Sequence, residues 1–351
     1  MSVLDPSDVV SPGVEPASLG GTPSPEAIRP PRVRLFDADQ TDRDLTFDEA
    51  LVVELSDRQL LWVDMVGPMT EADATALAER FDLAPSTRGA LQKLVPQPQI
   101  TLHGRYVAMT EATVHPTTDG EEVRWLQIVA GRNLVLTVHA EPIHFLDEMN
   151  TRIEADTPVG LINAASFVAS LMDAAVTSYL VAADGIEDAV ERLDTRLLSR
   201  NVRNDLFAEL VELRRRITRL RRRLTSHREL FASLGRADFA MITEGDAGAA
   251  FAGVAEHFER AIAAVENGGE LLLGSFDLYM TRTAQRTNEI VKVLTIVSVF
   301  LLPGTFIAGV MGMNIKAPYS NDDPNIFWIV GLVMVGISIG IAVVLRARRW
   351  F

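Results

Sequence analysis

The residues of this chain that are best suited to bind an ion form one stripe near its C-terminus. Small, polar and aliphatic side chains recur there every three or four positions, so they share one face of a helix. The members of this stripe are Asn288, Val291, Thr295, Ser298, Leu302, Thr305, Gly309 and Gly312. The stripe leads into the tripeptide Gly312-Met313-Asn314. Carbonyl and amide oxygens suit hard cations, so Gly312 and Asn314 are candidate metal ligands.

Gly312 is predicted to end this helix, because glycine readily adopts the left-handed conformation that terminates many helices. The final carbonyl groups then lack intrahelical partners and lie at the negative end of the helix dipole. If several copies surround one axis, these carbonyls and the side-chain oxygens of Asn314 form a collar of neutral oxygens. Mg²⁺ releases its water reluctantly, so such a collar suits a hydrated ion. The alternative is a seam of small residues that packs against another helix.

Two uncharged segments near the C-terminus are long enough to cross a membrane. Residues 293–315 and 324–345 carry no charged side chain, and a membrane-spanning helix needs about 20 apolar residues. We therefore predict transmembrane helices over 291–313 and 325–346, connected by an external loop over 314–324.

Basic residues indicate the orientation of this hairpin. Arg346, Arg348 and Arg349 lie at the end of the second segment and in the short tail over 347–351, whereas the connecting loop has one Lys and two Asp. The positive-inside rule then places both the N-terminal part and the tail in the cytoplasm. The expected location is the plasma or bacterial inner membrane, with several passes through it.

The second segment is apolar on all sides and suits a helix that faces lipid. Gly336 and Gly340 form a pair that would allow another helix to approach closely. Because neither one nor two helices can enclose a pore, the stripe on the first segment implies a ring-shaped homo-oligomer. The number of subunits does not follow from the pattern.

The rest of the chain must position these segments, and it has three parts. Residues 1–32 are rich in Pro, Gly and Ser, which predicts a disordered tail. Residues 33–157 predict an α/β domain, with a helix capped by Thr70 and Asp73. Its expected strands are VRLFDA, LLWVDMVG, ITLHGRYVAMTEATV, VRWLQIVAG and NLVLTVHA. Residues 158–290 predict long stalk helices with apolar positions at helical spacing.

The net charge and the residue content of the chain argue against several classes of function. The net charge of −14 argues against nucleic-acid binding and fits attraction of cations. The absence of cysteine excludes disulfides and thiolate metal sites. No nucleotide-binding motif and no nucleophile or acid–base constellation stands out, so we expect neither an enzyme nor a bound cofactor.

The stretch from Arg214 to Arg223 is unusually rich in arginine. Contact with nucleic acid is one interpretation. The favoured one is a solvated or inter-subunit face of a long helix, because an apolar stripe runs through the stretch. The expected ion-pair partners lie on the preceding helix and are Glu187, Asp188, Glu191 and Asp194.

At these motifs the chain resembles the CorA family of magnesium transporters. The resemblance rests on Gly312-Met313-Asn314 at the end of the first of two C-terminal spans, and on TNEIVKVLTI, LPGTFIAG and the ending RARRW. It implies an α+β membrane protein assembled as a homopentameric funnel. That fold has a cytoplasmic α/β domain, a long helical stalk and two C-terminal transmembrane helices.

The resemblance also implies roles for single residues. Gly312, Met313 and Asn314 would form the outer selectivity filter, and Leu294 and Leu302 would be apolar constrictions that gate the pore. The pore-lining set it implies is Asn288, Val291, Leu294, Thr295, Leu302, Thr305 and Gly309, to which the stripe adds Ser298. Asp277 is a candidate cytoplasmic ion or inter-subunit site.

The chain departs from the family pattern at several positions. Met311 stands where Tyr is usual, and Lys316 follows the signature. Members of the family often carry acids between their cytoplasmic domains that bind magnesium. The corresponding stretch here is STRGALQKLVPQPQ, which includes Gly89 and contains no acid, and Gly253 lies on the facing stalk helix. The ZntB-type zinc transporters share the fold and much of the signature.

Three functions follow in order of preference. The first is channel-like uptake of Mg²⁺, with Co²⁺ and Ni²⁺ as further ions, driven by the membrane potential. The second is transport of Zn²⁺ or a range of divalent cations, with proton coupling. The third is a membrane-anchored scaffold or sensor whose pore does not conduct. The expected partners are a divalent cation, the lipid bilayer and further copies of the chain.

Overall fold

The computed structural model describes residues 30–117, 120–152, 163–199, 205–234, 247–313 and 325–348 of the 351-residue chain. The chain divides into two compact units. The N-terminal unit comprises Met1–Arg192 and Ala208–Leu272, and the C-terminal unit comprises Leu193–Phe207 and Leu273–Phe351. The predicted tail lies almost wholly outside the described residues, as does the predicted loop over 314–324.

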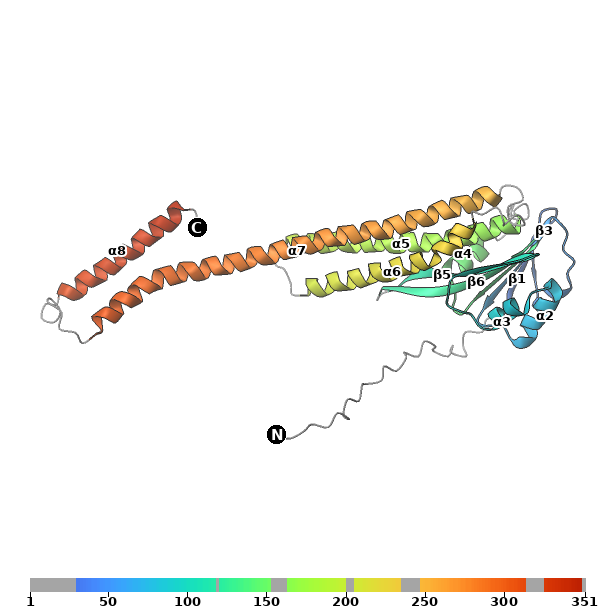
Figure 1. Cartoon of the computed structure of the whole chain (residues 1–351), viewed down its shortest axis with the longest axis horizontal. Helices are drawn as coiled ribbons and strands as arrows, with labels where there is room; N and C mark the ends of the chain where they lie inside the picture. The colour runs from blue at the N-terminus through green and yellow to red at the C-terminus, as the bar shows by residue number, and fades with distance from the viewer. Residues whose placement is uncertain are drawn as a thin grey trace, which may run out of the picture. The chain divides into compact units, whose positions relative to one another are not determined.

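A seven-stranded sheet forms the centre of the N-terminal unit (Figure 1). Its strands are β1 (Arg32–Asp37), β2 (Arg43–Leu45), β3 (Gln59–Val66), β4 (Gln99–His103), β5 (Tyr106–Thr117), β6 (Gly120–Gly131) and β7 (Leu134–His139). They lie in the order β2-β1-β3-β7-β6-β5-β4. β3 and β7 are parallel, and all other neighbours are antiparallel. The predicted α/β domain is confirmed as a mixed sheet with helices.

The structure differs from the predicted strands in two places. The stretch ITLHGRYVAMTEATV forms two strands, because the chain turns back at Gly104 and Arg105 and pairs His103 with Tyr106. The pattern also missed β2 and the short helix α1 (Phe47–Val52). α1 begins at a capping box in which Thr46 accepts from the amide of Glu49 and the Glu49 carboxylate accepts from the amide of Thr46.

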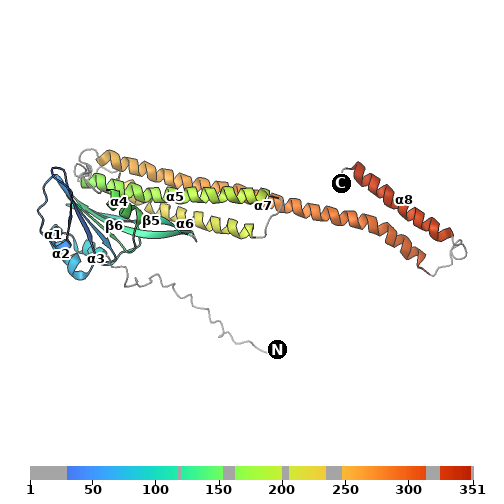
Figure 2. The same cartoon turned by 180° about the vertical axis from the view of Figure 1, so that it is seen from behind.

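Long helices follow the sheet in the chain. They are α4 (His144–Arg152), α5 (Ala164–Leu198), α6 (Leu206–Leu234) and α7 (Ala247–Met311). α5, α6 and the first part of α7 run side by side in both views (Figures 1 and 2). Phe231 of α6 stacks on Phe258 of α7 at 4.1 Å between ring centroids. His257 of α7 contacts Asp173 of α5 at 2.6 Å.

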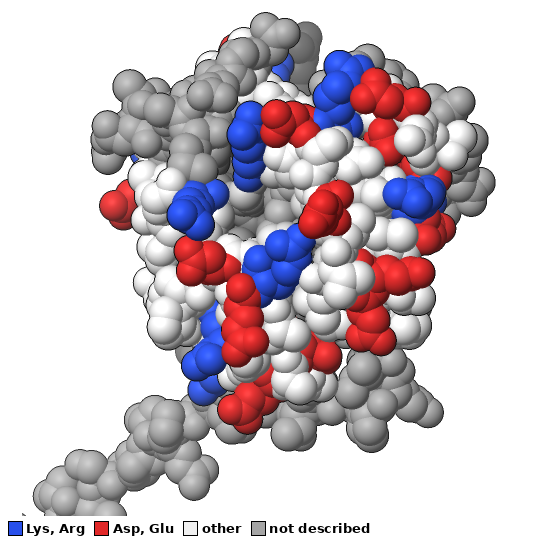
Figure 3. All heavy atoms as spheres, turned by 90° about the vertical axis from the view of Figure 1, so that its right-hand side faces the viewer, with Lys and Arg blue, Asp and Glu red and all other residues white. Residues whose placement is uncertain are grey.

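The arginine-rich part of α6 has other partners than expected. Its ion pairs are Arg216–Glu121, Arg215–Glu212, Arg219–Glu212 and Arg221–Glu266. Glu121 belongs to β6 and Glu266 to α7, so the predicted pairing with acids of the preceding helix is wrong. Glu187 of that helix instead accepts a hydrogen bond from Asn267 at 2.9 Å. Over the face drawn in Figure 3, basic and acidic side chains are interspersed.

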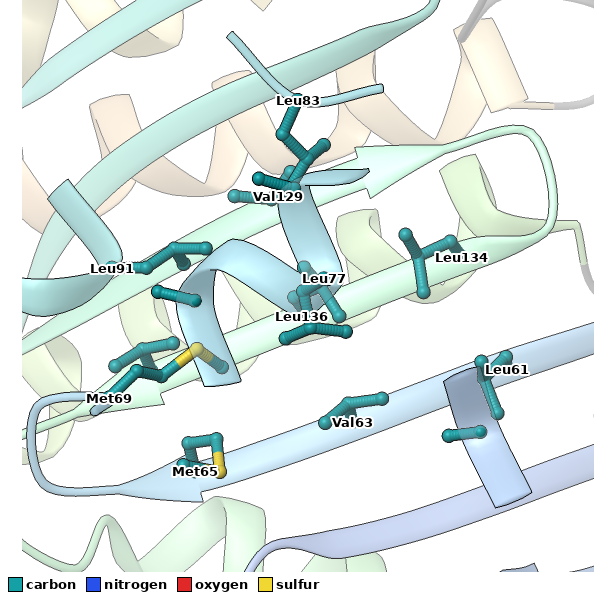
Figure 4. Close-up of a cluster of buried hydrophobic side chains, with 14 of the residues drawn as sticks. Leu61, Val63, Met65, Met69, Leu77, Leu83, Leu91, Val129, Leu134 and Leu136 are labelled. Atoms are coloured by element: carbon teal, nitrogen blue, oxygen red, sulfur yellow. The ribbon is translucent and has the colours of Figure 1, made fainter. Parts of the chain in front are cut away.

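One face of the sheet carries an apolar core covered by α1, α2 (Glu71–Phe81) and α3 (Pro85–Gln92). Alternate residues of β3 and β7 point into it, as the two-residue period of a strand requires. Figure 4 shows Leu61, Val63 and Met65 from β3 beside Leu134 and Leu136 from β7. The predicted cap of α2 is confirmed, because Thr70 accepts a hydrogen bond from the amide of Asp73 at 3.1 Å.

The other face of the sheet meets α5 through aromatic and polar side chains. Trp62 packs edge-on against Phe167 of α5 at 5.2 Å between centroids. Its indole N–H donates to Thr137 at 3.0 Å, and the Thr137 hydroxyl donates to Asp64 at 2.6 Å. His139 contacts the same Asp64 carboxylate at 3.1 Å. Trp62, Thr137, Asp64 and His139 therefore form one buried hydrogen-bonded group on this face.

Side chains of α5 and α6 seal the exposed edge of β5. β4 pairs with β5 only as far as Thr110. Beyond Thr110, the backbone amides of β5 that point toward this edge have no neighbouring strand to accept their hydrogen bonds. The amide of Ala112 donates to Nε2 of His227 at 2.8 Å, and the amide of Val114 donates to the hydroxyl of Ser178 at 2.9 Å. Burial lowers the pKa of His227 to about 4, which keeps Nε2 free to accept.

Glu111 is a buried acid beside this seal. It is 1% exposed, and neither carboxyl oxygen has a hydrogen-bond partner in the described part of the chain. Burial raises the pKa of Glu111 from its usual 4.5 to about 8. Burial, with Glu111 nearby, also raises the pKa of Tyr179. The folded protein therefore holds Glu111 in its neutral form at neutral pH.

The C-terminal unit contains the rest of α7 and α8 (Asn325–Ala347). Both helices are long and apolar enough to cross a membrane, and no residue of their most apolar windows is buried. α5 also meets the length and composition criteria, but half of its apolar window is buried. α5 packs on the sheet through Phe167, so it is a core helix of the N-terminal unit.

Candidate ion pathway

The stripe predicted from the sequence lies on the C-terminal half of one continuous helix, α7. The hydroxyls within it donate to carbonyl groups of the preceding helical turn. Thr295 donates to Val291 at 2.8 Å, Ser298 to Leu294 at 2.9 Å, and Thr305 to Leu301 at 3.0 Å. Because each of these hydroxyls donates to a backbone carbonyl, the polar side chains have no unsatisfied donor within an apolar helix.

The aliphatic members of the stripe are exposed in the single chain, Val291 at 53% and Leu302 at 66%. Leu294, the other predicted constriction, is 64% exposed. Asn288, Thr305 and Gly309 are exposed as well, whereas Thr295 and Ser298 are half-buried. A continuous exposed apolar surface of this length needs lipid or further protein to cover it.

α8 lies on another side of α7 than the stripe. A Cβ atom at Gly304 would stand 3.3 Å from Cε of Met334 in α8, so Gly304 marks the side that faces α8. Phe300, Pro303 and Ile307 are half-buried on the same side. At 3.6 residues per turn, Leu302 and Gly309 point about 160° and 140° away from Gly304. Most of the stripe therefore faces away from α8, whereas Thr305 and Gly312 lie at its edge, about 100° and 80° from Gly304.

The predicted glycine pair on α8 does not make this contact. Gly336 and Gly340 are exposed, and a Cβ atom at either position would meet nothing within 4 Å. The close approach between α7 and α8 instead uses Gly304 against the flexible end of Met334. Within one chain, therefore, Gly336 and Gly340 pack against no other helix, and close packing at this pair stays a prediction.

The end of α7 also differs from the prediction at Gly312. Its φ is not positive, so the expected left-handed turn is wrong. The Gly312 amide still donates to Ala308 at 2.9 Å, and the Met313 amide donates to Val310 at 3.2 Å, only three residues back. A Cβ atom at Gly312 would stand 3.3 Å from the Ala308 carbonyl oxygen. Glycine therefore allows the last turn to tighten around that carbonyl.

Asn314, the other predicted metal ligand, lies outside the described residues. Met313 is described and is 59% exposed. The structure thus places the stripe as far as Gly309 on α7, with Gly312 and Met313 directly after the end of this helix. The Asn314 side chain stays a prediction.

The cytoplasmic positions considered for a metal contain no carboxylate cluster. Asp277 is exposed on α7 and has no ion-pair partner among the described residues. Gly89 lines a cavity of about 350 Å³ beside α3 whose lining includes Lys93 and His103 and contains no acid. In the described part of the chain, no group of three His, Asp or Glu side chains is arranged to hold a metal ion.

The sequence reasoning missed the residues that orient the stripe. Gly304, Phe300, Pro303 and Ile307 define the side of α7 that meets α8. Their spacing of three, one and three residues is a helical signal that was available in the sequence. In a segment that is apolar on every side, however, this spacing does not stand out.

Comparisons with known proteins agree with this architecture. The family of CorA-like Mg²⁺ transporter proteins matches residues 57–348. The cobalt/magnesium transport protein CorA of Thermotoga maritima is 25% identical over 297 residues, which cover 82% of this chain and 83% of that protein. The divalent cation transporter CmaX of Pseudomonas aeruginosa is 22% identical, covering 86% and 91%. The zinc transport protein ZntB of Yersinia enterocolitica is 18% identical, covering 80% and 85%.

Solved structures show the same fold. The complete CorA magnesium transporter from Methanocaldococcus jannaschii has a TM-score of 0.75 at 19% identity and covers 92% of this chain and 99% of its own. Full-length CmaX has a TM-score of 0.69 at 20% identity, with 92% and 98% covered. The predicted sheet domain, long helices and two apolar C-terminal helices are thus confirmed. This chain belongs to the CorA family of divalent-cation transporters of the membrane.

Proposed function

We propose that this protein is a channel-like uptake system for Mg²⁺, with Co²⁺ and Ni²⁺ as further ions, and that the membrane potential drives the flux. The observation that carries the proposal is the uncharged stripe on α7, most of which faces away from α8 and which ends at Gly312 and Met313. A face of α7 left open by α8 is the face available to line a pore. The proposal involves no cofactor and no catalysed reaction.

One chain cannot enclose such a pore, so we propose a ring of identical subunits, with five as the expected number. In this ring α7 is the inner helix and α8 the outer one. The exposed aliphatic residues Leu294 and Leu302 then form apolar constrictions that close by excluding water. The hydroxyls of Thr295 and Thr305 donate their protons to backbone carbonyls. These side chains therefore offer the ion oxygen lone pairs rather than protons.

The chemistry of this pathway suits a hydrated divalent ion. From Val293 to Met313 the chain has no charged side chain, so an ion meets only neutral groups. Neutral oxygens bind a hydrated Mg²⁺ weakly enough to release it, whereas a ring of carboxylates would bind more tightly. A divalent ion that moves inward gains about 5 kcal/mol per 100 mV of potential, negative inside. That gain is sufficient without nucleotide hydrolysis.

A second candidate is transport of Zn²⁺ or several divalent ions, with proton coupling. The observation that favours it is the absence of acids at Gly89 and Gly253, together with the likeness to ZntB over 80% of this chain. A scaffold or sensor with a closed pore is the third candidate, from another functional class.

Ion flux into proteoliposomes distinguishes these candidates. We expect the reconstituted full-length protein to admit Mg²⁺, reported by an enclosed dye, and Asn314→Ala to abolish this flux. Ser338→Ala on α8 is the matched control and should leave the flux unchanged. Zn²⁺ flux that needs a pH gradient, without Mg²⁺ flux, would select the second candidate. Absence of any flux would favour the scaffold, and flux unchanged in Asn314→Ala would refute the oxygen collar.

Single cysteines test the pore face directly, because the natural chain contains none. Thr305→Cys places a thiol on the stripe, and Ile307→Cys places one on the side of α8. A membrane-impermeant cationic thiol reagent should modify the first and block transport, and it should leave the second unmodified. Equal modification at both positions would refute the assignment of the stripe to a water-filled pore.

A further inference from the structure

The N-terminal unit has a large cavity on the arginine-rich face of α6. The cavity, of about 880 Å³, opens between this face, the start of β6 and the segment around Gln97. Arginines 214, 215, 219, 222 and 223 line it. Glu121 is the acid in its lining, and Arg216 already pairs with that carboxylate. The volume lies within the range of about 300–1,000 Å³ typical of small-molecule sites.

The cavity has more positive charge than its own acids neutralise. Arg214 and Arg222 have no ion-pair partner among the described residues. Arg215 and Arg219 share the single carboxylate of Glu212, at 3.6 and 3.0 Å. Guanidinium groups that line one cavity and exceed its acids in number attract an anion into it.

The cavity also has an apolar wall next to these charges. Trp125 lines it, and Cζ of Arg223 lies 5.7 Å from the Trp125 ring centroid. Val123, Pro96 and Pro98 continue the apolar part of the lining. An inorganic ion would leave this wall uncovered, whereas an anion attached to an apolar or aromatic body would cover it.

We infer that this cavity binds an organic polyphosphate of the nucleoside triphosphate class. The planar guanidinium group matches phosphate oxygens two at a time, so Arg214, Arg215 and Arg222 are suited to the phosphate chain. The nucleoside part would lie toward Trp125. A nucleic acid is disfavoured, because a protein of net charge −14 repels a long polyanion.

Binding to the full-length protein in detergent tests the inference, with EDTA present so that no metal links ligand and protein. We expect ATP and inorganic triphosphate to bind, measured by calorimetry, and adenosine to bind far more weakly. The double variant Arg214→Gln/Arg222→Gln should weaken ATP binding at least about tenfold. Arg228→Gln, also exposed on α6 but paired with Glu259 outside the cavity, is the matched control and should change binding less than about twofold.

Tryptophan emission locates the ligand. Triphosphate should shift or quench the emission of the natural protein, and Trp125→Phe should remove this change while calorimetric binding persists. Binding that Arg228→Gln weakens as much as the double variant, or an emission change that survives in Trp125→Phe, would overturn the site. Absence of ATP binding combined with dissociation of the oligomer in the double variant would instead assign these arginines to a subunit contact. None of these readouts depends on ion flux.

Discussion

Replacing Glu111 by glutamine should stabilise the protein increasingly as the pH rises from 5 to 9. In the folded state burial raises the pKa of this carboxyl to about 8, whereas in the unfolded chain it titrates near 4.5. Between these values the folded protein retains a proton that the unfolded chain has lost. The free energy of unfolding therefore falls as the pH rises through this window, and the loss is complete above about pH 8.

The size of the effect follows from the pKa difference. One pKa unit corresponds to about 1.4 kcal/mol, so the shift from 4.5 to about 8 corresponds to an upper bound of about 5 kcal/mol. Glutamine has nearly the same shape and cannot ionise. Its amide also lacks a partner at this site, but that penalty is independent of pH and cancels when the two proteins are compared across the pH range.

Thermal unfolding of the full-length protein in detergent, followed by circular dichroism at pH 5, 7 and 9, measures the difference. The melting temperature of Glu111→Gln minus that of the natural protein should grow by up to about 7–9 °C from pH 5 to pH 9. Glu229→Gln, an exposed acid on α6, is the control and should show a constant difference. Parallel curves for Glu111→Gln and the natural protein would refute the assignment of a buried neutral carboxyl.

Three further predictions concern a cap, a buried histidine and the two membrane helices. Thr46→Ala removes the N-cap of α1 and should lower the free energy of unfolding by about 1 kcal/mol, measured by denaturant titration. His227→Ala leaves the amide of Ala112 without its acceptor and should cost about 1–3 kcal/mol at pH 7. Because the pKa of His227 falls to about 4 on folding, the natural protein loses stability as the pH drops from 6.5 to 4, and the variant should lose less. Gly304→Cys combined with Met334→Cys should cross-link through a short bifunctional thiol reagent within one chain, detected by electrophoretic mobility after cleavage between the helices.

Matched changes provide the controls. Thr117→Ala removes an exposed hydroxyl at the end of β5 that caps no helix, so it should cost less than Thr46→Ala. Equal acid sensitivity of His227→Ala and the natural protein would contradict the neutral buried imidazole. Efficient cross-linking of Gly304→Cys to Gly336→Cys in place of Met334→Cys would contradict the orientation of α8.

The apolar segments and the alternating strands could be predicted from the sequence because their patterns are simple. A charge-free segment of membrane length is conspicuous, and Thr70 with Asp73 is a recognisable helix start. β2 has three residues, too few for a period to appear, and it depends on pairing with β1. α1 could have been found from Thr46 and Glu49, which have the spacing of a capping box.

The differences at the candidate pathway have one cause: glycine permits a conformation or a close contact, but it does not require either. Glycine tolerates a left-handed conformation, but Gly312 does not adopt it. Gly312 instead takes part in a tightened last turn of the helix. Gly336 and Gly340 would permit close packing, yet Gly304 and Met334 make the contact. Which side of an all-apolar helix meets its neighbour depends on the partner's side chains, so a single helical pattern does not determine it.

The seal on the edge of β5 depends on residues that are made much later than the strand. Ser178 follows Val114 by 64 residues, and His227 follows Ala112 by 115. At synthesis rates of about 5–20 residues per second, the edge stays open for roughly 6–23 s before His227 exists. An open strand edge is a template for pairing with other chains. The risk that β5 pairs with a strand of another chain is therefore greatest in the nascent chain. It ends when α6 packs against the sheet.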